Sequence, residues 1–429
     1  MNKLSKTKFF ALFLLVMMSS AAHGQNGSSQ QQSSFQNGES GAASEGLLQK
    51  ITFQGLKRTK DSYLQGELKA FINRPLTSKT MSVIESDLQA MNLFSSINIE
   101  KIPASDGNLE LKITVKEKIT FIPLPFAMYS SGTGFMCGGF VMDMNAGGQK
   151  DMFVTGLLWS LDNTMVMGLY THSPKIGLPG FRLIGTVSNQ TRRLKNSDGD
   201  TLLKYEHLGA NASGSILFKL NRYNNLDAGL GYAGFFPKNQ DIHKDLYVRN
   251  RGIASAGWNI MDKEWNGVFL SETSFGLDGK ISLDNKAHAT TSVTSTLKIQ
   301  QPLIQKLRLN IDGGAGIVFN GLITDGLGKS SARVTILEDK FSTPKIAGAA
   351  TGLELAFLHI EKIGTFSIYG NYEFVFAQEF DDSLLFCQGF NTGMKVYLKG
   401  LAFPALSMGL AYNATKNQFS FAGSFGVSF

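Results

Sequence analysis

From residue 121 to the end of the chain, apolar and polar residues alternate in short segments with the period of a β-strand. A strand turns successive side chains to opposite faces. In residues 418–429 the aromatic side chains fall on one parity and the serines on the other. The aromatic set is Phe419, Phe421, Phe425 and Phe429. An apolar face that continues to the last residue is typical of the lipid-facing side of a membrane β-barrel.

The same alternation predicts sixteen strands. They cover residues 121–131, 133–145, 150–161, 164–173, 181–194, 203–220, 226–236, 247–261, 267–277, 287–301, 306–319, 347–360, 364–377, 385–398, 404–413 and 418–429. Many of these reach the roughly 9–11 residues that a tilted membrane-spanning strand needs. An even number of strands is usual for a closed bacterial barrel.

The links between the predicted strands differ between the two ends of the barrel. Those after even-numbered strands are short, as at residues 146–149 and 221–225. Several links after odd-numbered strands are longer and polar, and they cover residues 195–202, 237–246, 278–286 and 320–346. Outer-membrane barrels have short periplasmic turns and longer extracellular loops. The sequence therefore predicts a transmembrane antiparallel β-barrel over residues 119–429, with its N-terminal side in the periplasm.

The chain begins with a targeting pattern. Three lysines precede the apolar run at residues 9–18, and small residues follow up to Gly24. This predicts a signal peptide over residues 1–24, because the run is well short of the roughly 20 residues that a membrane-spanning helix needs. Residues 25–46 are rich in Gln, Ser and Gly and predict a flexible linker.

Residues 47–118 carry a different pattern. Asp61 and Thr77 each precede apolar residues at helical spacing, which predicts two capped amphipathic helices. The predicted strands of this region cover residues 47–54, 94–102 and 109–117. The order β-α-α-β-β predicts a small α+β domain with both helices on one face of a sheet.

This small domain resembles a POTRA module. The resemblance lies in ITFQGLKRT, which starts at Ile51, in IESDLQAMNLFSSINIE, which starts at Ile84, and in the third strand ending Val115-Lys116-Glu117. Such modules are periplasmic and precede the barrels of the outer membrane protein 85 superfamily, which includes BamA-like and TamA-like proteins of the bacterial surface antigen type. Sixteen strands, with a long loop between the eleventh and twelfth, also resemble that superfamily.

The resemblance implies a role in assembling, inserting or translocating proteins at the outer membrane of a diderm bacterium. A client strand would pair with the edge of the POTRA-like domain and pass to the seam between the first and last barrel strands. The client-binding edge comprises Phe94, Ile97, Ile99 and Ile102. The seam comprises Pro125, Phe126, Phe419, Phe421, Phe425 and Phe429.

Proline in the first barrel strand would weaken the seam, since proline has no N–H to donate to a β-ladder. The other interpretation of Pro123 and Pro125 places them in a linker before the barrel. In the superfamily the long loop carries an Arg-Gly-aromatic motif that contacts the barrel wall. Here Arg333 matches the arginine only, in the sequence SSARVTI. Arg333 is either this lumenal contact or a solvated loop residue.

No pattern of enzyme chemistry stands out. The six histidines lack partners at metal-ligand spacing, and there is no G-x-S-x-G motif. We therefore predict no enzyme activity, no cofactor and no metal, and the modest formal charge of +7 does not indicate nucleic acid. The expected partners are the outer-membrane bilayer, unfolded outer-membrane or secreted client proteins, and periplasmic accessory proteins. Two alternatives stay open: a passive pore or structural barrel with a docking module, and third, an outer-membrane hydrolase.

Overall fold

The computed structural model describes residues 46–91, 93–104, 107–131, 133–175, 177–238, 250–265, 268–360, 364–398 and 406–425. The predicted signal peptide and nearly all of the predicted linker lie outside these ranges. The chain divides into two compact units. Unit 1 comprises the residues up to Ile122 together with Met142–Phe153, and unit 2 comprises Pro123–Val141 and Val154–Phe429.

Unit 1 contains the small α+β domain in the predicted order. Its elements are β1 (Leu48–Gln54), α3 (Asp61–Leu68), η1 (Lys69–Phe71), α4 (Ser78–Ala90), β2 (Phe94–Pro103) and β3 (Leu109–Glu117). The sheet order is β1-β3-β2, so β3 is central, with β1 parallel and β2 antiparallel to it. Thr77 caps α4 as predicted, because its hydroxyl oxygen accepts the N–H of Thr80 at 3.1 Å.

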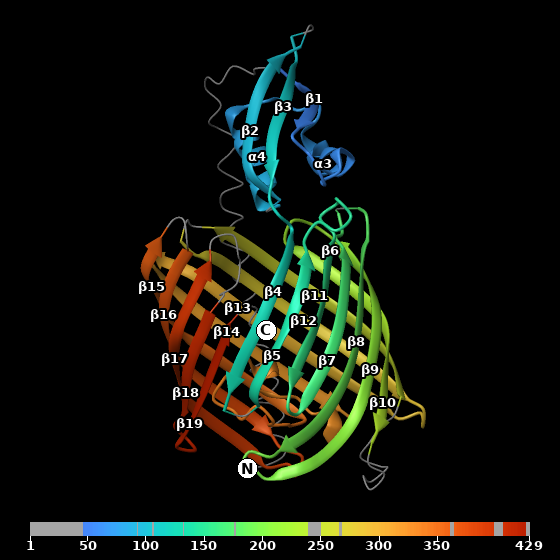
Figure 1. Cartoon of the computed structure of the whole chain (residues 1–429), viewed down its shortest axis with the longest axis vertical. Coiled ribbons are helices and arrows are strands. Elements are labelled where there is room, and N and C mark those ends of the chain that lie inside the picture. The colour runs from blue at the N-terminus through green and yellow to red at the C-terminus, as the bar shows by residue number, and fades with distance from the viewer. Residues whose placement is uncertain are drawn as a thin grey trace, which may run out of the picture. The chain divides into compact units, whose positions relative to one another are not determined.

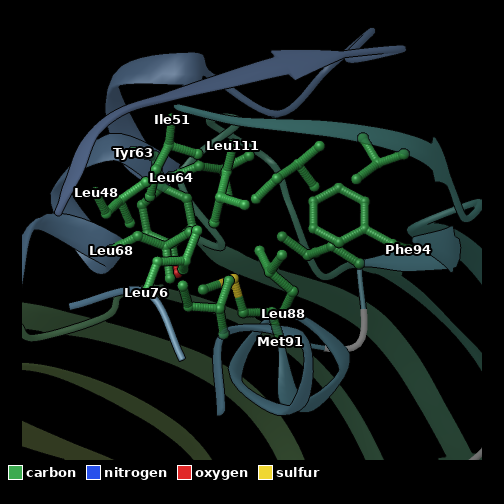
Figure 2. Close-up of a cluster of buried hydrophobic side chains, with 14 residues drawn as sticks. Leu48, Ile51, Tyr63, Leu64, Leu68, Leu76, Leu88, Met91, Phe94 and Leu111 are labelled. Atoms are coloured by element: carbon green, nitrogen blue, oxygen red, sulfur yellow. The ribbon is translucent and has the colours of Figure 1, made fainter. Parts of the chain in front are cut away.

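The core of this domain lies between the helices and the sheet. Figure 2 shows Leu64 and Leu68 of α3 and Leu88 of α4 gathered against Ile51 and Leu111 of the strands. Because the five side chains are almost completely removed from solvent, each stabilises the fold by about 1.5–3 kcal/mol. The apolar stripes in the two helices therefore mark their buried faces.

Glu117, the glutamate of the Val-Lys-Glu motif, holds the loop between β1 and α3. Its carboxylate accepts the backbone N–H of Arg58 at 2.9 Å and that of Thr59 at 2.8 Å. Burial alone would raise the pKa of Glu117, but hydrogen bonds from Thr59, Arg58 and Lys57 outweigh burial and hold that pKa below its usual value. The motif thus has a structural role at the end of β3.

We expect Glu117→Gln to destabilise unit 1 by about 1 kcal/mol, because the carboxylate is partly exposed and its hydrogen bonds are charge-assisted. The pKa of Glu117 is lower in the folded state than in the unfolded state, so its ionised carboxylate stabilises the fold at pH values above the ordinary carboxyl pKa. This contribution disappears as the pH falls through the lowered pKa. Pulse proteolysis in urea, at pH 7 and at acidic pH, would measure it. An equal loss for Glu117→Gln at both pH values would contradict this account.

The same loop meets the segment Met142–Phe153 inside unit 1. The Arg58 guanidinium donates to Asp143 at 2.6 Å and to the Thr120 hydroxyl at 2.9 Å. The Asn145 amide donates to the Thr59 hydroxyl at 3.0 Å, and the Lys60 N–H donates to the carbonyl of Gly148 at 2.8 Å. The loop that Glu117 anchors is therefore held from two sides.

Unit 2 is a closed antiparallel barrel of sixteen strands, one for each predicted segment (Figure 1). The strands are β4 (Phe121–Ser130), β5 (Gly134–Asp143), β6 (Met152–Ser160), β7 (Asn163–His172), β8 (Gly180–Lys195), β9 (Thr201–Lys219), β10 (Asn224–Pro237), β11 (Asn250–Trp265), β12 (Leu270–Asp284), β13 (Ala289–Ile304), β14 (Leu307–Phe319), β15 (Lys345–Ile360), β16 (Gly364–Gln378), β17 (Leu384–Leu398), β18 (Leu406–Asn413) and β19 (Gln418–Phe425). No helix among the described residues is long and apolar enough to cross a bilayer.

Fewer of the links after odd-numbered strands are long than the sequence predicted. The predicted loop at residues 278–286 is wrong, because β12 continues to Asp284 and pairs with β11 as far as Arg251. The predicted loop at residues 195–202 shortens to 196–200, because β9 begins at Thr201. Charged and small residues stand close together at these strand ends, so the ends resemble loops in sequence although they belong to the ladder. The long link between β14 and β15, residues 320–344, remains.

Candidate functional site

The seam of the barrel joins the first strand, β4, to the last, β19. Within the described residues the two strands pair at four positions, from Ser130 opposite Ala422 to Ala127 opposite Phe425. Elsewhere in the barrel, the ladder between β15 and β16 extends from Lys345 opposite Gln378 to Ile360 opposite Gly364, with one register shift between Ala356 and Leu358. Pairing at the seam is therefore established for residues 127–130 of β4 and 422–425 of β19.

The register also shows which backbone groups face the seam. The N–H of Ser131 donates to the carbonyl of Phe421 at 3.0 Å. In an antiparallel ladder, positions that exchange hydrogen bonds recur at every second residue. Tyr129, Ala127, Pro125 and Pro123 therefore turn the same side of the backbone toward β19.

Pro123 and Pro125 both lie inside β4. The interpretation that places them in a linker before the barrel is therefore wrong. Since proline has no N–H, β4 has no donor at these two positions, which precede Ala127 and lie beyond the four described pairs with β19. The defect falls on the seam and not on the ladder with β5.

The predicted seam residues divide between the two faces of the wall. Tyr129 and Phe421 lie across the seam from one another, with ring centroids 6.3 Å apart, and Phe419 is 67 % exposed. Phe126 has the opposite parity and is 3 % exposed, so it does not belong to the outer face. Phe425 pairs with Ala127 by its backbone, and Phe429 lies outside the described residues.

The long loop, residues 320–344, packs on one part of the barrel wall. It contains η3 (Ile323–Asp325) and α5 (Lys329–Ala332). One apolar cluster combines loop residues with wall residues from β15 to β18: Ala332, Val334, Ile336, Leu337, Phe341, Ile346, Val375, Ala377, Cys387 and Ala411. A loop that packs on four strands of a closed barrel, on the parity opposite to the exposed aromatic residues, lies against the inner face.

Glu373 of β16 anchors this loop. Its buried carboxylate accepts the backbone N–H of Thr335 at 2.6 Å and of Ile336 at 3.1 Å. It also accepts the Thr335 hydroxyl at 2.9 Å and the Asn391 amide at 3.3 Å. A buried carboxylate needs such donors to offset the loss of water. The sequence pattern placed Glu373 on the polar parity of its strand but did not single it out.

Arg333, the candidate from the sequence, contacts the wall less firmly. It ends α5 in the left-handed conformation, with φ of 58°. Its guanidinium lies 3.3 Å from the carboxylate of Asp312 on β14, and its side chain is 41 % exposed. An ion pair with this exposure contributes about 0–1 kcal/mol. The expected contact with the wall is present, but the buried anchor is Glu373.

The loop also reaches the seam strand. The Asp339 carboxylate accepts the hydroxyl of Ser130 in β4 and forms an ion pair with Lys329. Burial alone would raise the pKa of Asp339, but the Lys329 ammonium and the Ser130 hydroxyl hold it below its usual value. Lys195 also pairs with Glu338 of the loop at 2.9 Å. The long loop therefore contacts the first barrel strand β4, the strand β8 and the wall formed by β15 to β18.

A second buried polar cluster lies on β14, β15 and β17. Arg308 donates to Glu354 at 2.8 Å and to the Tyr397 hydroxyl at 2.8 Å, and Tyr397 donates to Glu354 at 2.9 Å. The Phe269 ring lies 4.5 Å from the guanidinium carbon of Arg308. Because all these charges have partners inside the cluster, it forms a closed polar network in the wall and not an open site.

In the small domain, β2 is an edge strand, as the client-binding prediction requires. Of the four predicted residues, only Ile102 has an exposed side chain, while Phe94 is 6 % exposed and belongs to the core. The register shifts next to Phe94, at Ser95, and this extra residue puts Phe94 on the same core-facing side of β2 as Ile97 and Ile99. The edge at β1 is partly occupied, because Leu48 exchanges hydrogen bonds with Asn73 and Arg74.

No metal centre is present among the described residues, because no group of three or more His, Cys, Asp or Glu side chains could hold an ion.

These features define the class of the protein by its fold: a closed sixteen-stranded antiparallel β-barrel with an N-terminal POTRA module. Residues 47–118 match the POTRA family, described as a surface antigen variable number repeat. The predicted resemblance and the predicted fold class are thereby confirmed.

Three solved structures share this fold over 90 % of the chain. BamA from Haemophilus ducreyi, in a form lacking POTRA domains 1–3, matches with a TM-score of 0.60 and 16 % identity over 86 % of its own length. CdiB from Acinetobacter baumannii and CdiB from Escherichia coli each match with a TM-score of 0.63 and 13 % identity, over 74 % and 77 % of their lengths.

Proposed function

We propose that this protein inserts client proteins into the outer membrane or translocates them across it. The observation that carries the proposal is the first barrel strand, which has proline instead of an N–H donor at two positions that the periodicity of the seam ladder turns toward β19, beyond the four described pairs. Each missing bond lowers the stability of the ladder by about 1 kcal/mol. A client strand has its own N–H groups, so it can donate to backbone carbonyls that face the two prolines and have no donor there.

The POTRA module serves as the place where the client first binds. Its edge strand β2 has backbone groups that an extended client can pair with, as in β-strand addition generally. We propose that the module lies in the periplasm, because the short links and the start of β4 belong to one end of the barrel and the long loop to the other. Clients would be unfolded outer-membrane or secreted proteins, with periplasmic accessory proteins as further partners.

Removal of the module tests the proposal against a passive pore. Full-length protein and a variant lacking residues 47–118 are reconstituted in liposomes, and the folding of an unrelated denatured barrel protein into them is timed. We expect the full-length protein to accelerate folding and the deletion to remove that acceleration. Folding no faster than into empty liposomes, with ion conductance intact in both proteins, would favour the passive pore.

Restoring the missing donors tests the seam directly. We expect the double substitution Pro123→Ala and Pro125→Ala to stabilise the closed seam by roughly 1–2 kcal/mol in total, because two N–H groups become available. Client folding should then slow by roughly tenfold. The matched control is Pro302→Ala on β13, away from the seam. Equal client folding rates for the seam variant and the control would contradict the role of the prolines.

A further inference from the structure

The link between β11 and β12 folds inward at one end of the barrel. In the antiparallel order of the strands this is the end opposite the long loop. The link residues Val268 and Phe269 are 6 % and 2 % exposed, and they pack against Ala356 of β15 and Tyr397 of β17. Ala356 has the same parity on β15 as Ile346, which the long loop covers. The link therefore packs on the inner face of the wall.

The strand order shows how far this link leaves its own part of the wall. Four strands, β13 to β16, separate β12 from β17. At the usual spacing of neighbouring strands, this is about 24 Å along the wall. The ring centroids of Phe269 and Tyr397 are nevertheless 6.4 Å apart. One aromatic side chain cannot bridge the difference, so Val268 and Phe269 lie inside the barrel end and narrow the lumen there.

Two polar contacts hold the link in this position. The hydroxyl of Thr365 on β16 donates to the carbonyl of Val268 at 3.4 Å. The guanidinium carbon of Arg308 lies 4.5 Å from the centroid of the Phe269 ring, which is a cation–π contact. Arg308 is fixed in turn by Glu354, to which it donates at 2.8 Å. The link is thus anchored to the closed polar network of the opposite wall.

The end of the barrel with the long loop is crossed as well, by the hairpin of β8 and β9. The N–H of Ser197, in the link of this hairpin, donates to the carboxylate of Glu379 after β16 at 3.3 Å. Since β8 and β16 are eight strands apart in a ring of sixteen, they are diametrically opposite. The long loop pairs with the same hairpin, because the Lys195 N–H donates to the carbonyl of Lys340 at 2.9 Å. The hairpin and the long loop together narrow this end.

We propose that the link between β11 and β12 is a gate of the lumen, in series with the constriction that the hairpin and the long loop form at the other end. This goes beyond client insertion at the seam, because it concerns passage through the barrel. The inner wall of β12 beside the link is polar, with Glu272 bonded to Lys298 at 2.8 Å. Val268 and Phe269 are apolar, and an ion that passes apolar side chains loses water without gaining partners.

Ion conductance of the full-length protein in planar lipid bilayers tests the inference. Phe269→Ala removes the ring from the lumen, and Phe269→Leu is the matched control that keeps a large apolar side chain there. Both are also made in a second background, in which Asn-Gly replaces residues 196–200. This two-residue hairpin turn removes the contact with Glu379. Heat-modifiable mobility in gel electrophoresis shows that each barrel is folded.

We expect Phe269→Ala alone to raise the conductance by about twofold or less, because the constriction at the other end stays in series with it. In the shortened-hairpin background the rise should be several-fold and should exceed the sum of the two separate increases. Phe269→Leu should conduct like its parent protein in both backgrounds. Equal conductance of Phe269→Ala and Phe269→Leu in the shortened-hairpin background would overturn the inference.

A second variant keeps the test decisive if Phe269→Ala does not fold. Thr365→Val removes the hydroxyl that donates to the carbonyl of Val268 and keeps the size of the side chain. In the shortened-hairpin background it should raise the conductance in the same direction as Phe269→Ala, by a smaller factor. The matched control is Leu303→Ser, an exposed residue near the link between β13 and β14 at the same end of the barrel. Equal conductance of Thr365→Val and Leu303→Ser would also overturn the inference.

Discussion

A disulfide across the seam, formed by Met128→Cys and Ser424→Cys, is expected to abolish client insertion while the barrel stays folded. The two residues are opposite one another in the register, between positions that exchange hydrogen bonds. Such a non-hydrogen-bonded pair has Cα atoms about 4.5 Å apart, within the range that a disulfide spans. A covalent bond there prevents β4 from separating from β19.

The seam disulfide is tested by timing the folding of a denatured barrel protein into liposomes that hold the oxidised variant, before and after a reductant is added. The rate should equal that of empty liposomes when oxidised and recover on reduction. Because Cys137 and Cys387 are free thiols, the variant is built with Cys137→Ser and Cys387→Ala.

The matched control is Thr186→Cys with Asn211→Cys on β8 and β9, whose side chains contact one another at 3.2 Å. This disulfide crosslinks two neighbouring strands away from the seam and should leave the rate unchanged. Undiminished insertion by the oxidised seam variant would show that clients do not enter between β4 and β19.

Glu373→Ala is expected to free the long loop from the inner wall. The substitution leaves the N–H groups of Thr335 and Ile336 and the Thr335 hydroxyl without their acceptor. An unsatisfied buried group costs about 1–3 kcal/mol, so the packed loop should lose roughly 3 kcal/mol or more. Trypsin cleavage at Lys329 or Lys340 should accelerate, and single-channel conductance should rise.

The matched control for Glu373→Ala is Asp312→Ala, which removes the residue on the barrel wall that pairs with Arg333. That pair is 41 % and 28 % exposed on its two side chains, so its loss should cost about 0–1 kcal/mol. Trypsin cleavage and conductance should stay close to those of the natural protein. If Asp312→Ala releases the loop as readily as Glu373→Ala, the arginine and not the glutamate is the anchor.

The sequence predicted all sixteen strands because the bilayer imposes a strict alternation where a strand crosses it. The same reasoning fails beyond the apolar band. The end of β12, up to Asp284, has Ile281 and Leu283 on its exposed face, but the charged residues Asp278, Lys280 and Asp284 on the other face make it resemble a polar loop although it belongs to the ladder. Strand existence could be predicted from the sequence, whereas strand length could not.

The candidate site was predictable in part. The absence of an N–H in proline can be seen in the sequence, but only the register shows that Pro123 and Pro125 turn toward β19. Glu373 is one acidic residue on the polar parity of an aromatic strand. Its role depends on the backbone of Thr335 and Ile336, which come from a distant loop. Phe94 was misplaced because a register shift at Ser95 turns it into the core.

The contact between Asp339 and Ser130 makes the long loop and the seam thermodynamically linked. Ser130 pairs with Ala422 at the seam, while its hydroxyl is held by the loop. Any process that moves β4 away from β19 must therefore also disturb the loop, and by reciprocity any ligand that draws the loop away must weaken the seam by the same free energy. A molecule acting on the loop at one end of the barrel is then expected to change how readily a client separates the two strands.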